Sequence, residues 1–305
     1  MKLSSLCNRK NVLILCIIVI LLYIISGFYN PLVLTRYDYT SSKVPEGFDG
    51  YRIVHISDFH CKEFGDGESD LIAMIRNAEP DLILFTGDSI DDEHSLDNYR
   101  DLITGIYDVA PIYYVNGNHE YDASAPLAEM KELNEKYQVH DLNDASVVVE
   151  HNGDSILLSG LDFRLTMRGL RNNIDYANTT MFNILLYHGT DKFDGIAPYN
   201  YDLVLSGHTH GGIVCLPFIG GIISNQKELF PKYDSGVYTS GLSTMISSRG
   251  LGDASIPRFH NPREVICITL HHSSQGIKKV PSRINLLPPQ FTLMKPYTLK
   301  PNISV

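Results

Sequence analysis

The chain has 305 residues, of which 44% are hydrophobic and 20% are charged, and this composition excludes a disordered chain and a multi-span membrane protein. The formal net charge of -10 argues against nucleic acid as a partner, because phosphate binding on that scale needs a basic surface. The five cysteines form no CxxC pair, so they predict no disulfide framework.

The first predicted element is a transmembrane helix within residues 1–29. Residues 12–29 carry no charge and are rich in Ile and Leu, which makes the run just long enough to span a bilayer. A cleaved signal peptide is the alternative, but Ile24 and Ser26 before Gly27 make a poor small-x-small cleavage site. We therefore expect the protein to enter the membrane through residues 12–29.

The charges that flank this run predict its orientation. Lys2, Arg9 and Lys10 precede it, and positive residues favour the cytoplasmic side, although Arg36 and Lys43 beyond the run weaken the bias. We expect a single-pass protein of the cell membrane whose globular part is extracytoplasmic.

The rest of the chain divides into a linker, a domain and a tail. Residues 30–50 contain prolines and glycines and are interpreted as a tether. Residues 51–272 are interpreted as one globular domain, and residues 273–305 as a basic, proline-containing tail. We expect this tail to lie over the body or stay loose, with binding to an anionic membrane as the alternative.

The domain begins with alternating strand and helix patterns. Strand-like runs YRIVHIS, DLILFTG and IYYVNG start at residues 51, 81 and 112, and the runs between them have helical spacing. This βαβ order predicts parallel strands with functional loops at their carboxyl ends. After a further helix-like stretch, APLAEMKELNEKY, the runs SVVVEHN and SILLSGLD flank a hairpin turn at Gly153. The later runs FNILLYHG, DLVLSGH, GVYTSG and EVICITLHH predict a second sheet stacked on the first.

Side chains of the kinds that bind metals follow five of these strands. The strand ends deliver Asp58-Phe59-His60, Gly87-Asp88, Gly117-Asn118-His119-Glu120, His188-Gly189 and Gly207-His208-Thr209-His210. Each piece alone is also typical of a surface loop or a core histidine. Their placement on one predicted rim, beside glycines that permit close approach, indicates a shared site.

The mixture of donors predicts the kind of metal site. Carboxylates, imidazoles and one amide suit Mn, Fe or Zn in a hydrolytic site, whereas structural zinc sites prefer cysteine. The donors are too many for one ion and about right for two divalent ions: Asp58, His60, Asp88, Asn118, His188, His208 and His210. Asp88 is the natural bridge between the ions. Alternate residues of an extended segment point in opposite directions, so His208 and His210 are expected to face different ions.

The ordered set DxH, GDS, GNHE, YHG and GHTH resembles the calcineurin-like metallophosphoesterase family over about residues 51–270. The anchor and the GHTHGG...LP continuation resemble the bacterial membrane-associated branch of that family. The resemblance implies an α/β fold, a four-layer αββα sandwich of two mixed β-sheets flanked by helices. It also implies two ligand sets, Asp58, His60, Asp88 and His210 for one ion and Asp88, Asn118, His188 and His208 for the other.

His119 matches the family's catalytic histidine, which is not a metal ligand, whereas the role of Glu120 is left open. The implied mechanism is attack on phosphorus by a hydroxide held between the ions, with His119 protonating or stabilising the leaving oxygen.

These inferences predict a membrane-anchored phosphoesterase that hydrolyses a phosphodiester or pyrophosphate bond, with a lipid-linked or envelope component as substrate. A phosphomonoesterase, acting as a protein phosphatase or nucleotidase, is the alternative on the same centre. A non-catalytic metal-binding scaffold is a second alternative, which the complete ligand set disfavours. A metallo-β-lactamase-like hydrolase is excluded, because the string HxHxDH does not occur.

Two weaker signals lie beside these motifs. RLTMRGLR places Arg164, Arg168 and Arg171 on one face if the segment is helical, as a solvated face or as a clamp for a substrate phosphate. Cys61 follows His60 directly and has three alternatives, which are to bind metal, to be oxidised or to pack inward.

Overall fold

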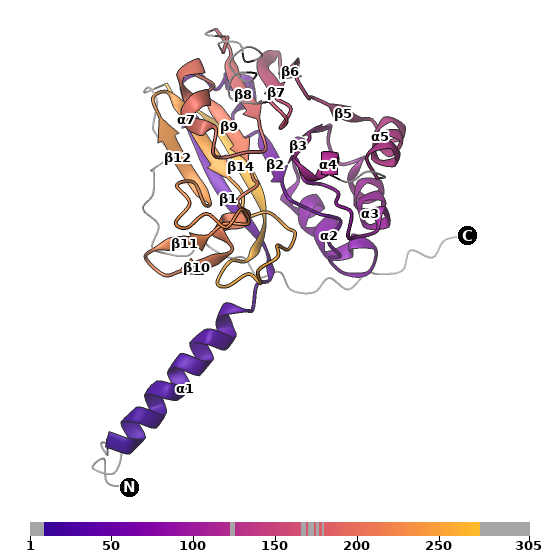
Figure 1. Cartoon of the computed structure of the whole chain (residues 1–305). Helices are drawn as coiled ribbons and strands as arrows, with labels where there is room; N and C mark the ends of the chain where they lie inside the picture. Colours follow the sequence, from indigo (N-terminus) through magenta and orange to yellow (C-terminus); the bar gives the residue numbers. More distant parts are fainter. Residues whose placement is uncertain are drawn as a thin grey trace, which may run out of the picture.

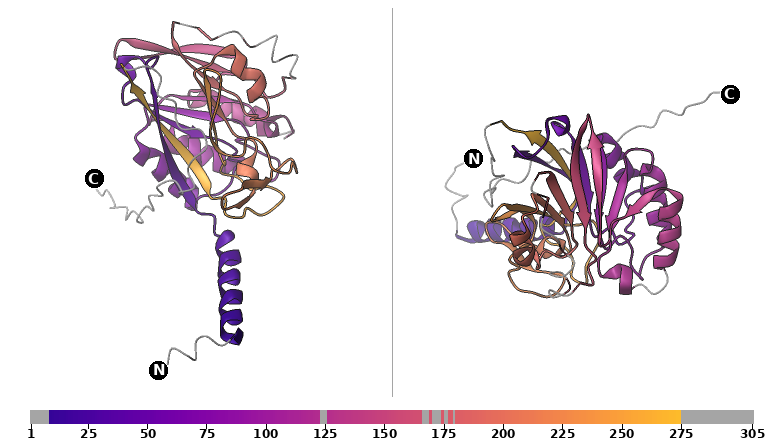
Figure 2. Two further views of the ribbon diagram at one scale, coloured as in Figure 1. Left: turned by 90° about the vertical axis from the view of Figure 1, so that its left-hand side faces the viewer. Right: turned by 90° about the horizontal axis from the view of Figure 1, so that it is seen from above.

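The computed structural model describes residues 9–122, 126–165, 169, 174, 177–178 and 180–274. Figure 1 shows a helix, α1 (Arg9–Gly27), that projects from a body built on two stacked β-sheets. Seen from above, the layers follow one another across the body, with α2, α3 and α5 outside the first sheet (Figure 2). This arrangement confirms the predicted four-layer αββα sandwich.

The first sheet has six strands in the order β1-β14-β2-β3-β4-β5. Their bounds are β1 (Leu32–Ser41), β14 (Arg263–His272), β2 (Arg52–Ile56), β3 (Leu82–Thr86), β4 (Ile112–Val115) and β5 (Val139–Asp141). Strands β2 to β5 are parallel, whereas β14 is antiparallel to β2, so the sheet is mixed. The parallel run confirms the predicted βαβ order.

Three amphipathic helices cover the outer face of this sheet. They are α2 (Ser69–Ala78), α3 (Leu96–Ile106) and α5 (Pro126–Lys136). The spacing of Leu71 and Ile75 puts both on one face of α2, where they are fully buried against strand residues such as Ile83. α3 begins after Ser95, whose hydroxyl accepts a hydrogen bond from the backbone N–H of Asp97 at 3.2 Å and caps the helix.

The second sheet has six strands in the order β12-β13-β9-β8-β7-β6. Their bounds are β12 (Gly236–Ser240), β13 (Ser243–Ser247), β9 (Leu203–Ser206), β8 (Phe182–Leu186), β7 (Asp154–Gly160) and β6 (Ala145–His151). The predicted hairpin at Gly153 joins the antiparallel pair β6 and β7. Two further strands, β10 (Val214–Leu216) and β11 (Gly220–Ile223), form a separate ribbon.

The core between the sheets follows from the two-residue period of the strands. Leu203 and Leu205 of β9 point toward the first sheet, and Val204 between them points outward. The outward side packs on Phe193 and Ile196 of the short helix α7 (Phe193–Ile196), which with the 3-10 turn η4 (Ala197–Tyr199) belongs to a thin fourth layer.

The interpretation of residues 30–50 as a tether is wrong. β1 occupies residues 32–41 of that segment and pairs with the whole of β14 at the edge of the first sheet. Val33 and Tyr39 are buried, and the hydroxyl of Thr35 donates to Oε2 of Glu264 at 2.6 Å. The prolines and glycines that indicated a linker lie outside the alternating run that makes the strand.

α1 has the length and composition of a membrane-spanning helix, with an 18-residue window of mean hydropathy 2.4 of which 6% is buried. A signal sequence satisfies the same criteria, so the anchor and its orientation stay predictions. The C-terminal end of α1 is bonded to the body, because the carbonyl of Gly27 accepts a hydrogen bond from the backbone N–H of His260 at 2.7 Å. The predicted tail beyond residue 274 lies outside the described residues.

Candidate metal centre

The predicted ligand loops meet where the carboxyl ends of the two sheets come together. Nδ1 of His188, after β8, donates to the carbonyl of Thr86 at the end of β3, at 2.7 Å. The backbone N–H of His208, after β9, donates to Oδ1 of Asp58, after β2, at 3.0 Å. These two hydrogen bonds join the sheets, so the stacking of the sheets creates the site.

Six of the seven predicted ligands fall into two groups that share one aspartate, and all six are buried. The groups are Asp58, His60, Asp88 and His210, and Asp88, His188 and His208, and within each group the ligand atoms lie within 4.8 Å of one another. Oδ2 of Asp88 lies 3.1 Å from Nε2 of His188 and 3.8 Å from Nε2 of His60. Asp88 thus has the position expected of a bridging carboxylate.

His208 and His210 belong to different groups, as expected, but the local reason differs from the predicted one. The segment is not extended, because the φ angles are 71° at His208 and 48° at His210. Asp58, His60 and Asp88 also have positive φ, between 49° and 51°. Non-glycine residues in this left-handed region cluster at functional sites, where the surrounding structure holds them in place.

Two carboxylates are buried in the centre in their ionised form. Burial raises the pKa of Asp58, but His210 and His188 outweigh burial and hold that pKa well below its ordinary value. The pKa of Asp88 is also lowered, because His188 and His60 outweigh the burial of the carboxylate. Buried negative charge of this kind requires compensating cations.

The histidines are suited to supply neutral nitrogen ligands. Burial lowers the pKa of His60 and of His208 to about 4, so both imidazoles are neutral at pH 7. Burial also lowers the pKa of His188, but the carboxylates of Asp88 and Asp58 raise it to about 9. Since Nδ1 of His188 donates to a carbonyl, Nε2 is the nitrogen that faces Asp88, and a bound cation would replace the proton there.

Two further atoms show that the residues fit divalent cations. Within the described part of the chain, Nε2 of His60 and Oδ1 of Asn118 are buried without a hydrogen-bond partner. Asn118 follows β4 and lies beside the two groups as a wall of the adjoining pocket. Buried polar atoms without partners are rare unless an ion or water serves them.

Comparison with known proteins identifies the family. The family profile described as calcineurin-like phosphoesterase matches residues 51–212. The chain belongs to the calcineurin-like phosphoesterase family.

Three relatives of this metallophosphoesterase show how far the likeness extends. The uncharacterized metallophosphoesterase YkuE of Bacillus subtilis is 32% identical over 250 residues, which cover 77% of this chain and 84% of that protein. The phosphodiesterase YaeI of Escherichia coli is 24% identical, over 72% of this chain and 82% of the relative. The UDP-2,3-diacylglucosamine pyrophosphatase LpxG of Chlamydia muridarum is 25% identical over 298 residues, which cover 78% of this chain and 89% of that protein. The protein is therefore a metal-dependent phosphoesterase with a two-metal site.

Two acids that support the ligands of this metallophosphoesterase were not identified from the sequence. Glu120 is buried and accepts hydrogen bonds from the backbone N–H groups of Asp88 at 2.9 Å, Ser89 at 2.6 Å and Gly117 at 2.6 Å. Burial, together with Asp88, raises the pKa of Glu120 to about 7. The signal in the sequence was its place three residues after Gly117 in the GNHE motif. The role of Glu120 is to hold together the loops that carry Asp88 and Asn118.

The second supporting acid is Asp91, which is 4% exposed. Its Oδ2 lies 3.6 Å from Nδ1 of His60, on the side of the ring away from Asp88. The carboxylate of Asp91 accepts hydrogen bonds from His94, from the backbone N–H at 2.8 Å and from Nδ1 at 2.9 Å, so it faces the ring of His60 without a hydrogen bond to it. A carboxylate at this position behind a metal-ligating histidine is of the kind that orients the ring when metal is bound. The sequence placed Asp91 within a run of acidic residues, which offered no sign that it differs from its neighbours.

His119 stands next to the centre without joining either ligand group. Its backbone N–H donates to Oδ1 of Asp88 at 2.8 Å, and its ring lies 4.6 Å from the ring of His60. The side chain is half-buried. The assignment of His119 as a catalytic residue that binds no metal stays a prediction.

A pocket of about 380 Å³ opens beside the metal centre. Its walls are Asn118, Tyr121, Phe163, Arg164, Leu165, Tyr187 and Lys192. Arg164 lies over the ring of Tyr121 at 3.8 Å and 3.2 Å from the carboxylate of Asp162. Of the three predicted clamp residues, Arg164 therefore lies at the site, and Arg168 and Arg171 fall outside the described residues. Lys192 is a second cation of this pocket that the sequence analysis missed.

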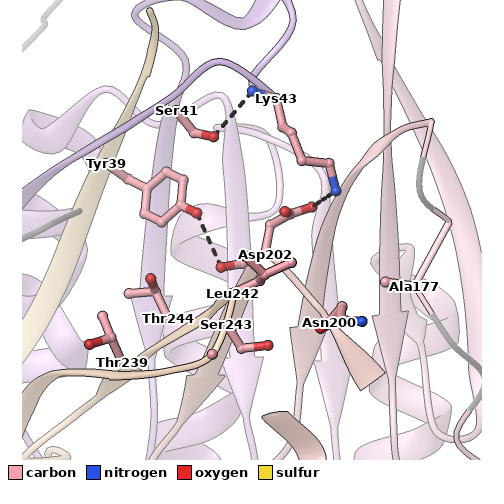
Figure 3. A pocket seen from close by; sticks show the side chains of 11 residues that line it. Tyr39, Ser41, Lys43, Ala177, Asn200, Asp202, Thr239, Leu242, Ser243 and Thr244 are labelled. Carbon is pink, nitrogen blue, oxygen red and sulfur yellow. Dashed lines mark hydrogen bonds and ion pairs between the residues drawn. The ribbon is translucent and has the colours of Figure 1, made fainter. Parts of the chain in front are cut away.

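A second pocket, of about 290 Å³, lies at the opposite end of the second sheet and is shown in Figure 3. Nζ of Lys43 pairs with the carboxylate of Asp202 at 2.7 Å, and the hydroxyl of Tyr39 donates to the carbonyl of Asp202 at 3.1 Å. Its two charged side chains neutralise each other, so this pocket lacks the ligand character of the metal centre.

Cys61 packs inward. The thiol is buried in the core beside the helices, and its Sγ lies 3.7 Å from the carbonyl of Ser89. Burial raises the pKa of Cys61 to about 12, so the side chain stays a protonated thiol at neutral pH.

Proposed function

We propose that the protein is a membrane-anchored phosphoesterase that hydrolyses a phosphodiester or pyrophosphate bond in a lipid-linked or envelope component. The observation that carries the chemistry is the sharing of Asp88 between two buried ligand groups. One ion is assigned to Asp58, His60, Asp88 and His210, and the other to Asp88, Asn118, His188 and His208. Two divalent cations bound there supply Lewis-acid activation of water and neutralise phosphoryl charge.

The chain's own residues orient the substrate and handle the leaving group. Arg164 and Lys192 lie on the pocket wall, where each pairs with a neighbouring carboxylate, that of Asp162 or of Asp191. In this proposal the substrate phosphate competes with those carboxylates for the two cations. His119, half-buried beside the ligands, donates a proton to the leaving oxygen. The hydrogen bond from its backbone N–H to Oδ1 of Asp88 holds the backbone of His119 beside the shared carboxylate.

Three observations support a diester or pyrophosphate that is linked to a lipid. The pocket beside the centre has room for a second substituent on phosphorus. The relatives YaeI and LpxG are named as a phosphodiesterase and as a pyrophosphatase of a diacylated sugar nucleotide. The exposed apolar helix α1 would hold the body next to lipids.

The test is the activity of the purified full-length protein with added Mn²⁺. We expect faster turnover of bis-p-nitrophenyl phosphate than of p-nitrophenyl phosphate, and two metal ions per chain by elemental analysis. The Asp88→Asn variant should lose turnover and metal, whereas Asp92→Asn, an exposed neighbour, should retain both. Equal activity of the two variants would contradict the proposed centre, and a clear preference for the monoester would favour the phosphomonoesterase.

A further inference from the structure

Four large apolar side chains are exposed together on the ribbon that follows the metal ligands. Phe218 is 82% exposed and Ile219 54% exposed, in the turn between β10 and β11. Leu229 and Phe230 are 65% and 63% exposed, and a backbone hydrogen bond of 2.9 Å from Phe230 to Ile222 holds them beside β11. We call Phe218, Ile219, Leu229 and Phe230 the apolar ridge. Single exposed apolar residues are common, but a group of this size on one ribbon marks a contact surface.

The backbone of the ridge presents its aromatic rings to the outside at a cost in strain. The φ angles are 67° at Phe218 and 53° at Phe230. Bulky residues rarely adopt this left-handed conformation, and the protein retains it at both phenylalanines. The fold thus retains two exposed phenylalanines in a strained backbone conformation.

The ribbon that carries the ridge is bonded to the end of α1. Phe28, just after the helix, packs its ring against Phe259 with centroids 5.3 Å apart. Phe259 in turn is bonded to the ribbon, because its carbonyl accepts from the backbone N–H of Cys215 at 2.8 Å. The views of Figure 1 and Figure 2 place β10 and β11 at the end of the body from which α1 leaves. Tyr29, 73% exposed, adds a further aromatic residue at this end.

The metal centre lies against the same end of the body. The side-chain amide of Asn261 donates to the carbonyl of His210 at 2.6 Å, and the backbone N–H of Asn261 donates to Oδ1 of Asn30, three residues beyond α1, at 2.9 Å. The amide nitrogen of Gln226, in the segment between β11 and the end of the ridge, contacts Nε2 of His208. Short contacts thus connect the ligands with both the helix exit and the ridge.

We infer that the apolar ridge inserts into the leaflet from which α1 emerges and holds the metal centre at the level of the lipid headgroups. The inference rests on the proposed anchor and narrows the substrate to a phosphate linked to a lipid in that leaflet. A bilayer is the occupant that this position favours, because β10, next to the ridge, is bonded to Phe259, which packs on Phe28 at the exit of the proposed anchor. Aromatic residues beside an exposed lysine, here Lys227, are typical of the membrane interface.

The absence of tryptophan from the sequence makes a direct test possible. Phe218→Trp and Phe230→Trp each introduce a single fluorophore into the ridge of the full-length protein. Leu242→Trp is the matched control, since Leu242 is an apolar turn residue that is 65% exposed. It precedes β13, which runs parallel to β9 with Thr244 opposite Leu203, so it lies at the other end of the strands from His208. Each variant is reconstituted into phosphatidylcholine and phosphatidylglycerol vesicles with and without brominated acyl chains.

Brominated lipid should quench at least half of the fluorescence of Phe218→Trp and Phe230→Trp and leave Leu242→Trp unchanged. Equal, weak quenching of all three would overturn the inference. Blue-shifted but unquenched emission from the ridge variants would identify a second copy or a protein partner as the occupant, and would overturn it as well. Flotation with the vesicles reports insertion of α1 separately.

Turnover of bis-p-nitrophenyl phosphate by the same samples separates this inference from the proposed function. Retained turnover without quenching would refute only the insertion of the apolar ridge into the membrane, because the enzyme would be folded and active. Quenching of folded protein without phosphoesterase activity would refute the proposed function and leave the membrane contact standing.

Discussion

At the residue scale, the position of His119 distinguishes a catalytic role from a role as a metal ligand. The ring lies beside His60, but the side chain belongs to neither ligand group. His119→Ala should keep two metals and lose about 10²- to 10⁴-fold in turnover, the usual effect of removing a general acid. Elemental analysis and kcat measured on the same samples test this. His140→Ala, at an exposed histidine of β5, is the control, and loss of metal from His119→Ala would refute the assigned role.

Asp91 allows a test of whether a carboxylate behind the metal ligand His60 strengthens metal binding. Because its carboxylate lies 3.6 Å from Nδ1 of His60, Asp91→Asn should weaken metal affinity by about 10- to 100-fold. Competition with a chelator, read as the metal concentration that restores half of the activity, measures the effect. The adjacent Asp92→Asn should change nothing, since Asp92 is exposed. Unchanged metal affinity in both variants would show that Asp91 binds only His94 and does not support the metal ligand His60.

At the scale of elements, β1 determines where a stable body begins. A fragment that starts at Asn30 keeps every pair between β1 and β14, whereas one that starts at Tyr51 exposes the edge of β14 and the partner of Thr35, Glu264. We expect the longer fragment to be soluble and to melt cooperatively. The shorter one should aggregate, because an exposed strand edge pairs with other chains. Light scattering and thermal melts compare them, and equal melting temperatures would contradict this role of β1.

The start of α2 contains a buried acid that should make stability depend on pH. Burial raises the pKa of Glu68 from its ordinary value near 4.5 to about 7, although its carboxylate accepts a hydrogen bond from the backbone N–H of Phe64. The folded state therefore binds this proton more tightly than the unfolded state. Its contribution to stability is full below pH 4.5 and is lost as the pH rises through 7.

Glu68→Gln removes this titration and retains an oxygen that can accept from Phe64. We expect the free energy of unfolding at pH 8 to exceed that of the wild type by about 1 kcal/mol, after allowance for screening by nearby water. At pH 4.5 the two proteins should be nearly equal. Denaturant unfolding at both pH values measures the difference, and a variant that is less stable at pH 8 would show that the charged carboxylate is favourable.

At the scale of the whole molecule, sequence patterns predicted the parts whose signals are local. The strand ends that carry Asp58, Asp88 and His208 were found because glycines and polar residues interrupt apolar runs there. The pairing of β1 with β14 joins residues more than 200 positions apart, such as Leu32 and Arg263, and nothing local specifies it. The approach of Asp91 to His60 at 3.6 Å joins the loops after β3 and β2, so it depends on the pairing of these two strands in the first sheet.

The orientation of the whole molecule in the membrane is the last prediction. Lys2, Arg9 and Lys10 precede the apolar run and favour a cytoplasmic N-terminus, which places the body outside. In spheroplasts of a bacterial expression host, a membrane-impermeant maleimide should label Leu242→Cys, because this position is 65% exposed and far from the helix exit. Lys2→Cys should react only after lysis. The wild-type chain gives the background from its own cysteines, and labelling of Leu242→Cys only after lysis would place the metal centre in the cytoplasm, with its substrate in the inner leaflet.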